Sequence, residues 1–294
     1  MAKELAFENK VPADLSQYQV RKTSPVTKVI TYIFLAIWTV INLYPLFWML
    51  IYSFKTDNEI LTGNPLKFPA VWQWSNYSTA WAKIDLPDMF KNSVIVAAAT
   101  IAITVFAALM ATYAITRIKW KLAGVVNSTL MLGLTIPIHS ALIPIFMSFA
   151  KLHINNTYWA LIIPYSAFAL SMAILICTGF MVEIPMDLDE AAHIDGCGIW
   201  GIFFRIIVPL MRPALATIAI YTFLQCWNEY MLASILCGSL KTIPVGIASF
   251  SGGHDTDYAL IGAGLVLATL PTLIVYVFLS NKIQESFIAG AIKG

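Results

Sequence analysis

Long apolar segments separated by short polar ones dominate this sequence. A helix that crosses a hydrocarbon core of about 30 Å needs about 20 apolar residues, since each residue adds about 1.5 Å. Six segments meet this requirement: Val29–Ile51, Val94–Ile115, Ala123–Phe149, Tyr158–Val182, Pro213–Ile235 and Tyr258–Leu279. The pattern predicts an all-α polytopic membrane protein, with a polar segment over residues 1–28 and a six-helix transmembrane domain over residues 29–294.

Prolines fall inside several of these segments. Membrane helices tolerate proline because neighbouring helices satisfy the freed backbone groups, so ordinary kinking is favoured over a hinge at each single position. The third segment contains both Pro137 and Pro144, and it is therefore predicted to be the least regular.

The composition supports a membrane protein. The chain is 59% hydrophobic and 12% charged, whereas soluble domains carry about 25% charged residues. The net charge is +2 and no basic stripe is present, so nucleic-acid binding has no support. The four cysteines form no C-x-x-C pair and have no adjacent histidine cluster, so we expect packing residues and no metal site.

Lysine and arginine are distributed unevenly between the two sides. With a cytoplasmic N-terminus, twelve basic residues lie in inside segments and six in outside segments, which agrees with the positive-inside rule. The clearest inside segment holds Arg117, Lys119 and Lys121 without an acid. Both termini are therefore predicted to be cytoplasmic, and the first span is predicted to act as an uncleaved signal and anchor.

The predicted outside loop Ser53–Ser93 is rich in aromatic residues. Tyrosine and tryptophan favour the membrane–water interface, so this loop is expected to lie on the outer surface. Its aromatic residues include Trp72, Trp74, Tyr77 and Trp81.

The inside loop over residues 183–212 begins with a predicted short helix. Pro185 ends the fourth span, and Asp187 is a plausible N-cap, with Asp189 and Glu190 in a first turn where the helix dipole favours acids. Asp195-Gly196 is predicted to end the helix. A narrow apolar face is predicted at Leu188, Ala191 and Ala192.

A second helical stretch follows in the same loop. Its spacing places Trp200, Phe203, Phe204 and Ile207 on one face, and Pro209 and Pro213 then lead into the fifth span.

Two interpretations of the acidic helix are open. It could dock on a basic partner surface, with Glu190 and Asp195 meeting cationic side chains, or it could lie on lipid as an amphipathic helix. Its acid content argues against the second interpretation, because the inner leaflet is itself negative.

The residues Glu190-Ala191-Ala192 and Asp195-Gly196, followed by Pro209 and Pro213, resemble the EAA-type loop of binding-protein-dependent ABC importer permeases. The similarity extends from about residue 30 to the C-terminus. Weaker similarities, in Trp227-Asn228-Glu229-Tyr230 and in the tail Gly290–Gly294, are typical of the carbohydrate-uptake branch and of the maltose-type subunit with a short outer loop.

This resemblance implies a type I ABC importer permease fold in the bacterial cytoplasmic membrane. The implied partners are a second homologous permease, two ATPase subunits and an extracytoplasmic solute-binding protein. The inside loop would then be the coupling helix seated in an ATPase cleft, with its contacts made by Leu188, Glu190, Ala191, Ala192, Asp195 and Gly196.

The sequence has no phosphate-binding loop of the G-x-x-x-x-G-K-[S/T] type and no Gly-Lys dipeptide. This chain is therefore not expected to hydrolyse ATP, and it is expected to hold no cofactor. ATP and Mg²⁺ are expected in the partner ATPase.

Glu229 is the only acid within the six predicted spans, and such a residue is a functional candidate by default. It belongs to a set of solute-pathway candidates: Gln225, Trp227, Asn228, Glu229 and Tyr230. A structural bond between helices is an equally open interpretation. His139, the only histidine in these spans, is expected to be a packing residue.

The predicted outside turn at residues 251–255 resembles in position a loop that reaches into the binding protein in maltose-type permeases. Its candidates for that contact are Gly252, Gly253, His254 and Asp255.

Other functions stay open at this stage. The solute could be a polar molecule other than a sugar. An ion-coupled secondary carrier usually shows internal repeats and several buried charges, whereas this sequence has no clear repeat and one buried acid. An intramembrane enzyme would need a nucleophile–base pair or metal ligands, and the sequence offers neither.

Overall fold

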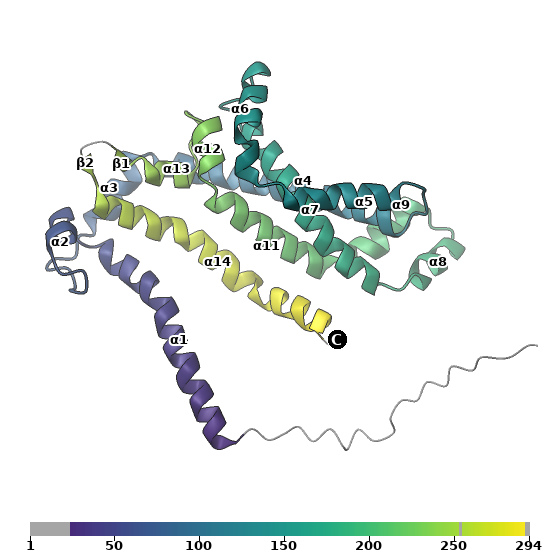
Figure 1. Ribbon diagram of the computed structural model, residues 1–294, viewed down its shortest axis with the longest axis horizontal. Coiled ribbons are helices and arrows are strands. Elements are labelled where there is room, and N and C mark those ends of the chain that lie inside the picture. Colours follow the sequence, from purple (N-terminus) through teal and green to yellow (C-terminus); the bar gives the residue numbers. More distant parts are fainter. Residues whose placement is uncertain (1–23, 253–254, 292–294) are drawn as a thin grey trace, which may run out of the picture. The chain divides into compact units, whose positions relative to one another are not determined.

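The computed structural model describes residues 24–252 and 255–291, with the backbone alone for residues 252, 255 and 279–291. The chain divides into two compact units, Met1–Trp48 and Met49–Gly294. Figure 1 shows the element order along the chain.

The first unit is described from the helix α1 (Pro25–Tyr52), which continues into the second unit. Its length and hydropathy qualify it as a membrane span. Thr31 and Thr39 donate to the carbonyls four residues earlier, and Asn42 does the same through its side-chain amide. These polar groups are therefore satisfied within the helix, as an apolar surrounding requires.

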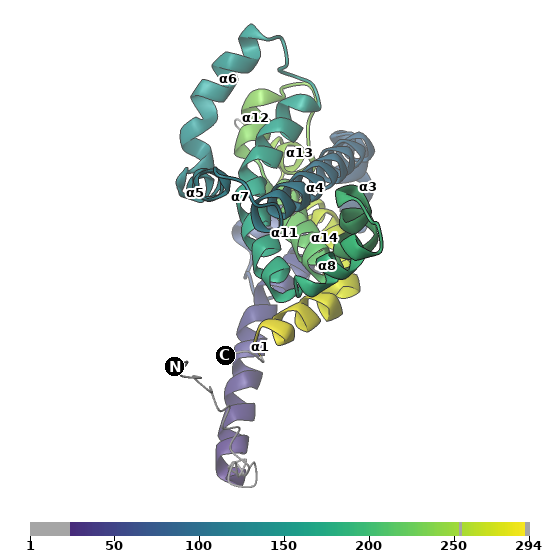
Figure 2. The ribbon, with the colours of Figure 1, turned by 90° about the vertical axis from the view of Figure 1, so that its right-hand side faces the viewer.

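Four long helices form the core of the second unit: α4 (Leu86–Thr116), α7 (Trp159–Glu183), α11 (Arg212–Asn228) and α14 (Tyr258–Ala291). α4 lies against α7, and α11 contacts α4, α7 and α14 (Figures 1 and 2). Small buried side chains such as Ala108, Ala173 and Cys177 lie in this core. Small residues let helix backbones approach closely, which stabilises helix pairs where lipid removes the hydrophobic drive.

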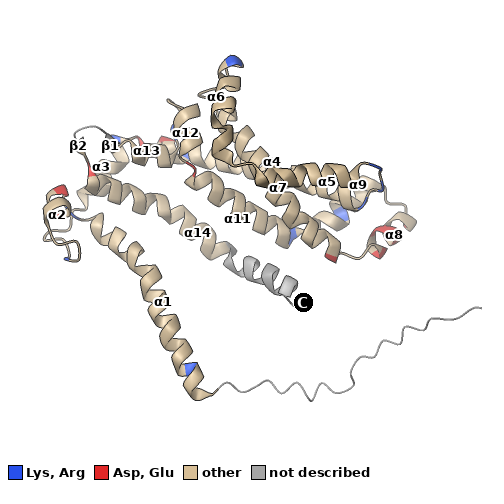
Figure 3. Cartoon of the chain, in the orientation of Figure 1, with Lys and Arg blue, Asp and Glu red and all other residues tan. Residues whose placement is uncertain are grey.

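α4 has 31 residues and therefore a length of about 46 Å, which exceeds a hydrocarbon core of about 30 Å. The helix is therefore long enough to reach from one side of the membrane to the other. The end at Leu86 adjoins α3 (Ser75–Lys83), and the end at Thr116 adjoins α8 (Asp187–Ile194) (Figure 1). Figure 3 shows the charged residues concentrated near such helix ends and in α8.

The predicted spans at positions one, two, four and six are confirmed as helices of membrane-spanning length: α1, α4, α7 and α14. The second begins at Leu86, eight residues before the predicted start at Val94, with Pro87 in its first turn. A proline is tolerated there because the first amides of a helix have no intrahelical partner.

The third predicted span, Ala123–Phe149, is wrong as a continuous helix. It consists of α5 (Ala123–Leu132), the 3-10 turns η2 (Gly133–Thr135) and η3 (Ile138–Ala141), and α6 (Leu142–Lys151). The two halves meet at 93°. Ile136 is extended because the ring of Pro137 disfavours a helical residue before it. The prediction that this segment is the least regular is thus supported.

The fifth predicted span, Pro213–Ile235, is also interrupted. α11 ends at Asn228, Glu229 is extended, and α12 (Met231–Leu236) follows. The segment Ile199–Leu210, before α11, is bent from α11 by 72°. The described residues thus hold four single spans, or six if this bent pair and the bent third segment each count as one span. The all-α polytopic fold is confirmed.

The loop between α1 and α4 contains α2 (Asp57–Thr62) and α3. The ring of Phe54 is surrounded by Trp72, Trp74 and Tyr77, with ring centroids 5.0, 4.7 and 5.2 Å away. Trp72, Trp74 and Trp81 stay partly or largely exposed. Their predicted place at the outer membrane surface stays a prediction.

The remaining elements of the second unit are short. α13 (Ile243–Ala248) precedes a hairpin of β1 (Ser251–Gly252) and β2 (Asp255–Thr256), in which Ser251 pairs with Thr256 and Gly252 with Asp255. The segment between α8 and α11 consists of α9 (Ile199–Ile202), the π-helix η4 (Phe203–Ile207) and α10 (Val208–Leu210).

Candidate functional site

α8 begins immediately after a break at the end of α7. Ile184 is extended before Pro185, and Met186 occupies the N-cap position without a side-chain capping bond. The predicted N-cap at Asp187 is therefore wrong by one position, because Asp187 is the first helical residue. The first turn carries Asp187, Asp189 and Glu190, where the helix dipole favours negative charge.

The end of α8 forms a Schellman motif. The amide of Gly196 donates to His193 over 3.0 Å and that of Cys197 donates to Ala192 over 2.9 Å. Gly196 has φ +83°, a left-handed conformation that glycine adopts without a Cβ penalty. The predicted helix end at Asp195-Gly196 is confirmed.

The predicted apolar face of α8 is divided by the structure. Ala192 is buried in the helix core at 6% exposure, whereas Leu188 and Ala191 are exposed. Glu190, Asp195 and Gly196 are also exposed. Ala192 packs α8 onto the rest of the protein, and the predicted role of these residues in docking stays a prediction.

Two exposed apolar residues near these acids, Ile194 and Ile199, were not identified from the sequence. Ile194 is 85% exposed, and Ile199 and Trp200 follow it at 58% and 61%. Ile194, an isoleucine at the end of a short acidic helix, is the feature of the sequence that could have predicted this exposure. Ile194 lies four residues after Glu190 in the same helix, so an exposed apolar side chain and an exposed acid share one face of α8.

Trp200, Phe203, Phe204 and Ile207 do not share one environment, so their predicted single face is wrong. Phe203 and Ile207 are buried, whereas Trp200 and Phe204 are exposed and stacked, with ring centroids 6.0 Å apart. The reason is the π-helix η4, whose wider turn changes the α-helical spacing assumed for these positions.

Arg117, which the sequence presented only as an inside charge, contacts α8 directly. Its guanidinium Nη1 lies 3.1 Å from Oδ2 of Asp189. The amide of Glu190, the next residue, donates to the carbonyl of Met186 over 3.1 Å, but its carboxylate makes no hydrogen bond or ion pair with the residues that the structure describes. α8 is thus held by one acid and presents the other.

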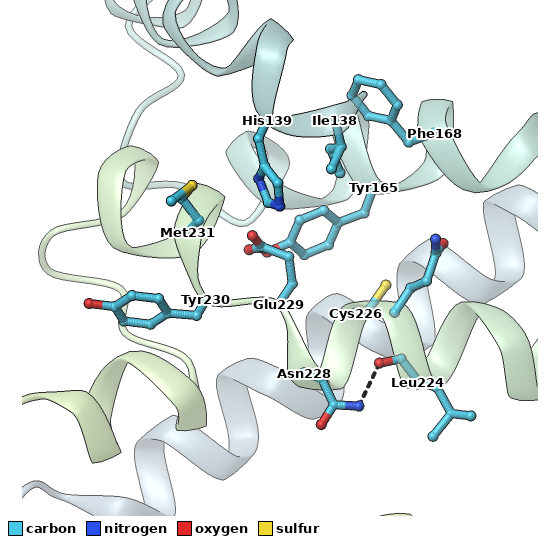
Figure 4. Close-up of a pocket in the computed structure, with 11 residues that line it drawn as sticks. Ile138, His139, Tyr165, Phe168, Leu224, Cys226, Asn228, Glu229, Tyr230 and Met231 are labelled. Atoms are coloured by element: carbon cyan, nitrogen blue, oxygen red, sulfur yellow. Dashed lines mark hydrogen bonds between the residues drawn. The ribbon is translucent and has the colours of Figure 1, made fainter. Parts of the chain in front are cut away.

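A second candidate site lies where both interrupted helices break. A cavity of about 410 Å³ is lined by residues of η3, α7, α11 and α12 (Figure 4). Its polar lining includes His139, Tyr165, Gln225, Asn228 and Glu229. The cavity also has apolar walls, including Phe168 and Met231.

Glu229 is bound by the backbone of α12. Its Oε1 accepts the amide of Leu232 over 2.8 Å, and its Oε2 accepts the amide of Ala233 over 3.1 Å. The hydroxyl of Tyr165 donates to the same Oε2 over 2.5 Å. The structural interpretation of Glu229 is therefore realised, although the residue also lines the cavity.

The other solute-pathway candidates line two cavities, and Asn228 and Tyr230 line both of them. Gln225, Asn228 and Tyr230 line the cavity of Glu229. Trp227 does not; it is 3% exposed, stacks on Phe223 and donates to the carbonyl of Ala268 over 3.0 Å. Trp227 instead joins α11 to α14 and lines a mainly apolar second cavity of about 470 Å³.

His139 is exposed toward the Glu229 cavity, so its expected role as a packing residue is wrong (Figure 4). It follows Pro137 in η3, where the broken third span leaves side chains uncovered. The described residues contain no group of three or more His, Cys, Asp or Glu that could hold a metal ion.

The binding-protein contact candidates lie at the hairpin of β1 and β2. Gly252 and Asp255 pair with each other across it, as the predicted turn requires. Gly253 and His254 lie outside the described residues.

Helices long and apolar enough to cross a membrane define a multi-pass membrane protein. Residues 101–288 match the family described as the inner membrane component of binding-protein-dependent transport systems, and the chain belongs to this family. The matched region contains α8 and the Glu229 cavity. The family expected from the EAA-type residues is confirmed.

Relatives and solved structures agree with this assignment. The chain is 32% identical to the diacetylchitobiose uptake system permease protein NgcG of Streptomyces coelicolor, covering 90% of this chain and 88% of that protein. It is 34% identical to the trehalose/maltose transport system permease protein MalG of Thermococcus litoralis, covering 87% and 93%. A bacterial ABC transporter involved in import of the acidic polysaccharide alginate shares the fold, with a TM-score of 0.75, 18% identity, and coverage of 88% of this chain and 96% of that chain.

Proposed function

We propose that this chain is the permease subunit of an ATP-driven importer for a carbohydrate, and that α8 docks on a separate ATPase subunit. The observation that carries the proposal is the different bonding of two adjacent acids, Asp189 and Glu190. Asp189 is held by Arg117, whereas Glu190 is exposed and unpaired among the described residues. An ordered but unpaired carboxylate favours a cationic partner.

The exposed apolar residues around Glu190 support a protein partner. A protein surface buries apolar side chains such as Ile194 and Trp200, while a rim acid fixes the register of docking. α8 lies at the end of α4 that precedes Arg117. The distribution of basic residues predicts that this end faces the cytoplasm. ATP and Mg²⁺ bind there to the ATPase subunits.

A second permease, two ATPases and an extracytoplasmic binding protein complete the proposed assembly, and both termini of this chain are cytoplasmic. A carbohydrate is favoured because two relatives are named as permeases for diacetylchitobiose and for trehalose and maltose. The Glu229 cavity has hydroxyl and amide groups suited to sugar hydroxyls, including those of Tyr230, Asn228 and Gln225.

An ion-coupled carrier is disfavoured by the bonding of Glu229. Both of its oxygens accept hydrogen bonds from this chain, so the acid is committed to structure. A polar solute other than a sugar is the second candidate, because the same cavity groups could bind it.

Transport is tested in vesicles that contain the complete complex and its binding protein, with radiolabelled maltose, trehalose and diacetylchitobiose as solutes. Uptake of one of these should stop with vanadate and continue with a protonophore. Uptake that depends on the proton gradient would contradict the proposal. Uptake of none of the three would remove these disaccharides and favour another polar solute.

Docking is tested by the charge reversal Glu190→Lys. Recovery of the ATPase with the complex should fall at least tenfold while membrane insertion persists. Asp88→Lys is the matched control, because it makes the same charge change at an exposed position at the other end of α4. Unchanged ATPase recovery with Glu190→Lys would contradict docking through α8.

A further inference from the structure

Arg117 is the residue at which three helices meet. It directly follows α4, and its own amide donates to the carbonyl of Tyr113 over 2.9 Å. Its Nη2 donates to the carbonyls of Met181 and Ile184 over 2.8 and 2.6 Å. Its Nη1 contacts Asp189 of α8, and the whole side chain is only 5% exposed.

The two carbonyls belong to the end of α7. The last four carbonyls of an α-helix lack the amide donor that the next turn would supply, although that of Met181 also accepts the amide of Ile184 over 3.3 Å. A cation at this end is favoured by the helix dipole. Arg117 therefore caps α7 with one nitrogen and holds α8 with the other. A planar guanidinium with five donors suits this arrangement, whereas the ammonium of lysine offers a single point of contact.

The segment after α8 returns to the same turn of α4. The ring of Tyr113, four residues before Arg117, lies 5.2 Å from the ring of Phe203, and both side chains are buried. Arg117 thus holds the beginning of α8, and Tyr113 holds the chain that follows it. The last turn of α4 contacts both flanks of the acidic helix.

This attachment determines where Glu190 points. Successive residues of an α-helix are separated by about 100° around its axis, so fixing Asp189 toward the protein turns Glu190 away from it. The structure shows this division, since Asp189 is half-buried and Glu190 exposed.

We infer that Arg117 is a positioning residue for ATPase docking, which holds α8 in one orientation on the ends of α4 and α7. The inference rests on the proposed function, because it concerns the same docking helix. Arg117 does not touch the ATPase; it acts by ordering α8 before docking. Loss of this attachment therefore adds an ordering cost to binding.

Two measurements separate positioning from docking. The full-length chain is produced with its partner permease in nanodiscs, deuterium exchange is measured over residues 187–194, and the ATPase subunit is then titrated. Arg117→Gln should speed exchange in α8 about tenfold and weaken ATPase binding about tenfold. Asp189→Asn should act in the same direction, and Arg117→Lys should give an intermediate result because it keeps only the charge.

The double variant Arg117→Gln/Asp189→Asn should be no worse than Arg117→Gln alone, because both changes remove one shared interaction. Glu190→Lys should weaken ATPase binding without changing exchange in α8. Lys119→Gln removes a basic charge two residues away at an exposed position, and it should change neither measurement.

Unchanged deuterium exchange in α8 for both Arg117→Gln and Asp189→Asn would overturn the inference. Weakened ATPase binding by Glu190→Lys in the same experiment would leave the proposed docking intact. Normal ATPase binding by Glu190→Lys would instead contradict the proposed function. If Arg117→Gln does not fold, Asp189→Asn, which preserves the side-chain shape, decides the outcome alone.

Discussion

The hydroxyl of Tyr165 donates a hydrogen bond to the carboxylate of Glu229 over 2.5 Å, and so joins α7 to the break between α11 and α12. The same carboxylate accepts two amides from the first turn of α12. An acid placed at a helix N-terminus satisfies amides that have no intrahelical partner. The interruption of the fifth span is therefore supported by specific bonds.

Removing these bonds should destabilise the protein, and the loss should be larger for Glu229→Ala than for Tyr165→Phe. Glu229→Ala leaves two amides and the Tyr165 hydroxyl without their acceptor, and should lower the free energy of unfolding by about 2 kcal/mol. Tyr165→Phe removes one bond and should cost about 1 kcal/mol. Thermal unfolding of the purified complex measures both. Asn228→Ala is the control, since its side-chain amide donates to the carbonyl of Leu224 within its own helix. An equal loss there would contradict the capping role.

The sequence was sufficient to predict elements that depend on local signals. Four spans follow from counting apolar residues, because the hydrocarbon thickness sets helix length. The end of α8 at Gly196 follows from the backbone freedom of glycine. Neither prediction needs knowledge of a distant residue.

The breaks were only partly predictable: Pro137 and Pro144 indicated an irregular third span, but nothing comparable marked the break after Asn228. Hydropathy counts apolar residues and does not record whether the helix continues through them, so α5–α6 and α11–α12 each looked like one span. The role of Arg117 depends on Asp189, 72 positions along the chain. A charge count records Arg117 as an inside residue, and only the packing of α4 against α7 brings its guanidinium to α8.

The side chain of Asp57 caps a helix that begins about 200 residues later. Its Oδ1 accepts the amide of Ala259, in the first turn of α14, over 2.8 Å. Asp57→Ala should lower the free energy of unfolding by about 1 kcal/mol, whereas Asp57→Asn keeps an acceptor oxygen and should cost less. Deuterium exchange at the start of α14 measures the local effect.

Lys83→Gln is a comparison for Asp57→Ala. It breaks the ion pair with Asp257 beside the same helix, but both side chains are substantially exposed. Exposed ion pairs contribute about 0–1 kcal/mol, so the change should be the smaller of the two. A larger loss in the free energy of unfolding from Lys83→Gln than from Asp57→Ala would show that the Asp57 cap is not the main stabilising contact at this end of α14.

Cys197 provides a test of orientation. It is partly exposed and lies in the segment directly after α8, whereas Cys177, Cys226 and Cys237 are buried. A charged maleimide should therefore label Cys197 in inside-out vesicles and leave right-side-out vesicles unlabelled. Cys197→Ser is the control and should abolish the signal. Labelling confined to right-side-out vesicles would place α8 outside and remove the basis for docking on an ATPase.

Glu59 gives the loop between α1 and α4 a pH dependence. Its pKa lies below the ordinary value of 4.5, chiefly because the backbone amide of Thr56 and then that of Ala70 donate to its carboxylate. A carboxyl whose pKa is lowered on folding stabilises the fold above its unfolded pKa, and the stabilisation is lost as the pH falls through the lowered value. The capping box of α2 should thus be complete above pH 4.5 and open progressively below it.

A spin label at Leu61→Cys, an exposed position in α2, reports this opening in a chain that also carries Cys197→Ser. The label should gain mobility with a midpoint below pH 4.5, and the change should disappear in Glu59→Gln, which has no charge to lose. A midpoint at or above pH 4.5 would show that the two amides do not favour the ionised carboxylate, since a hydrogen bond to the charged form can only lower the pKa of Glu59.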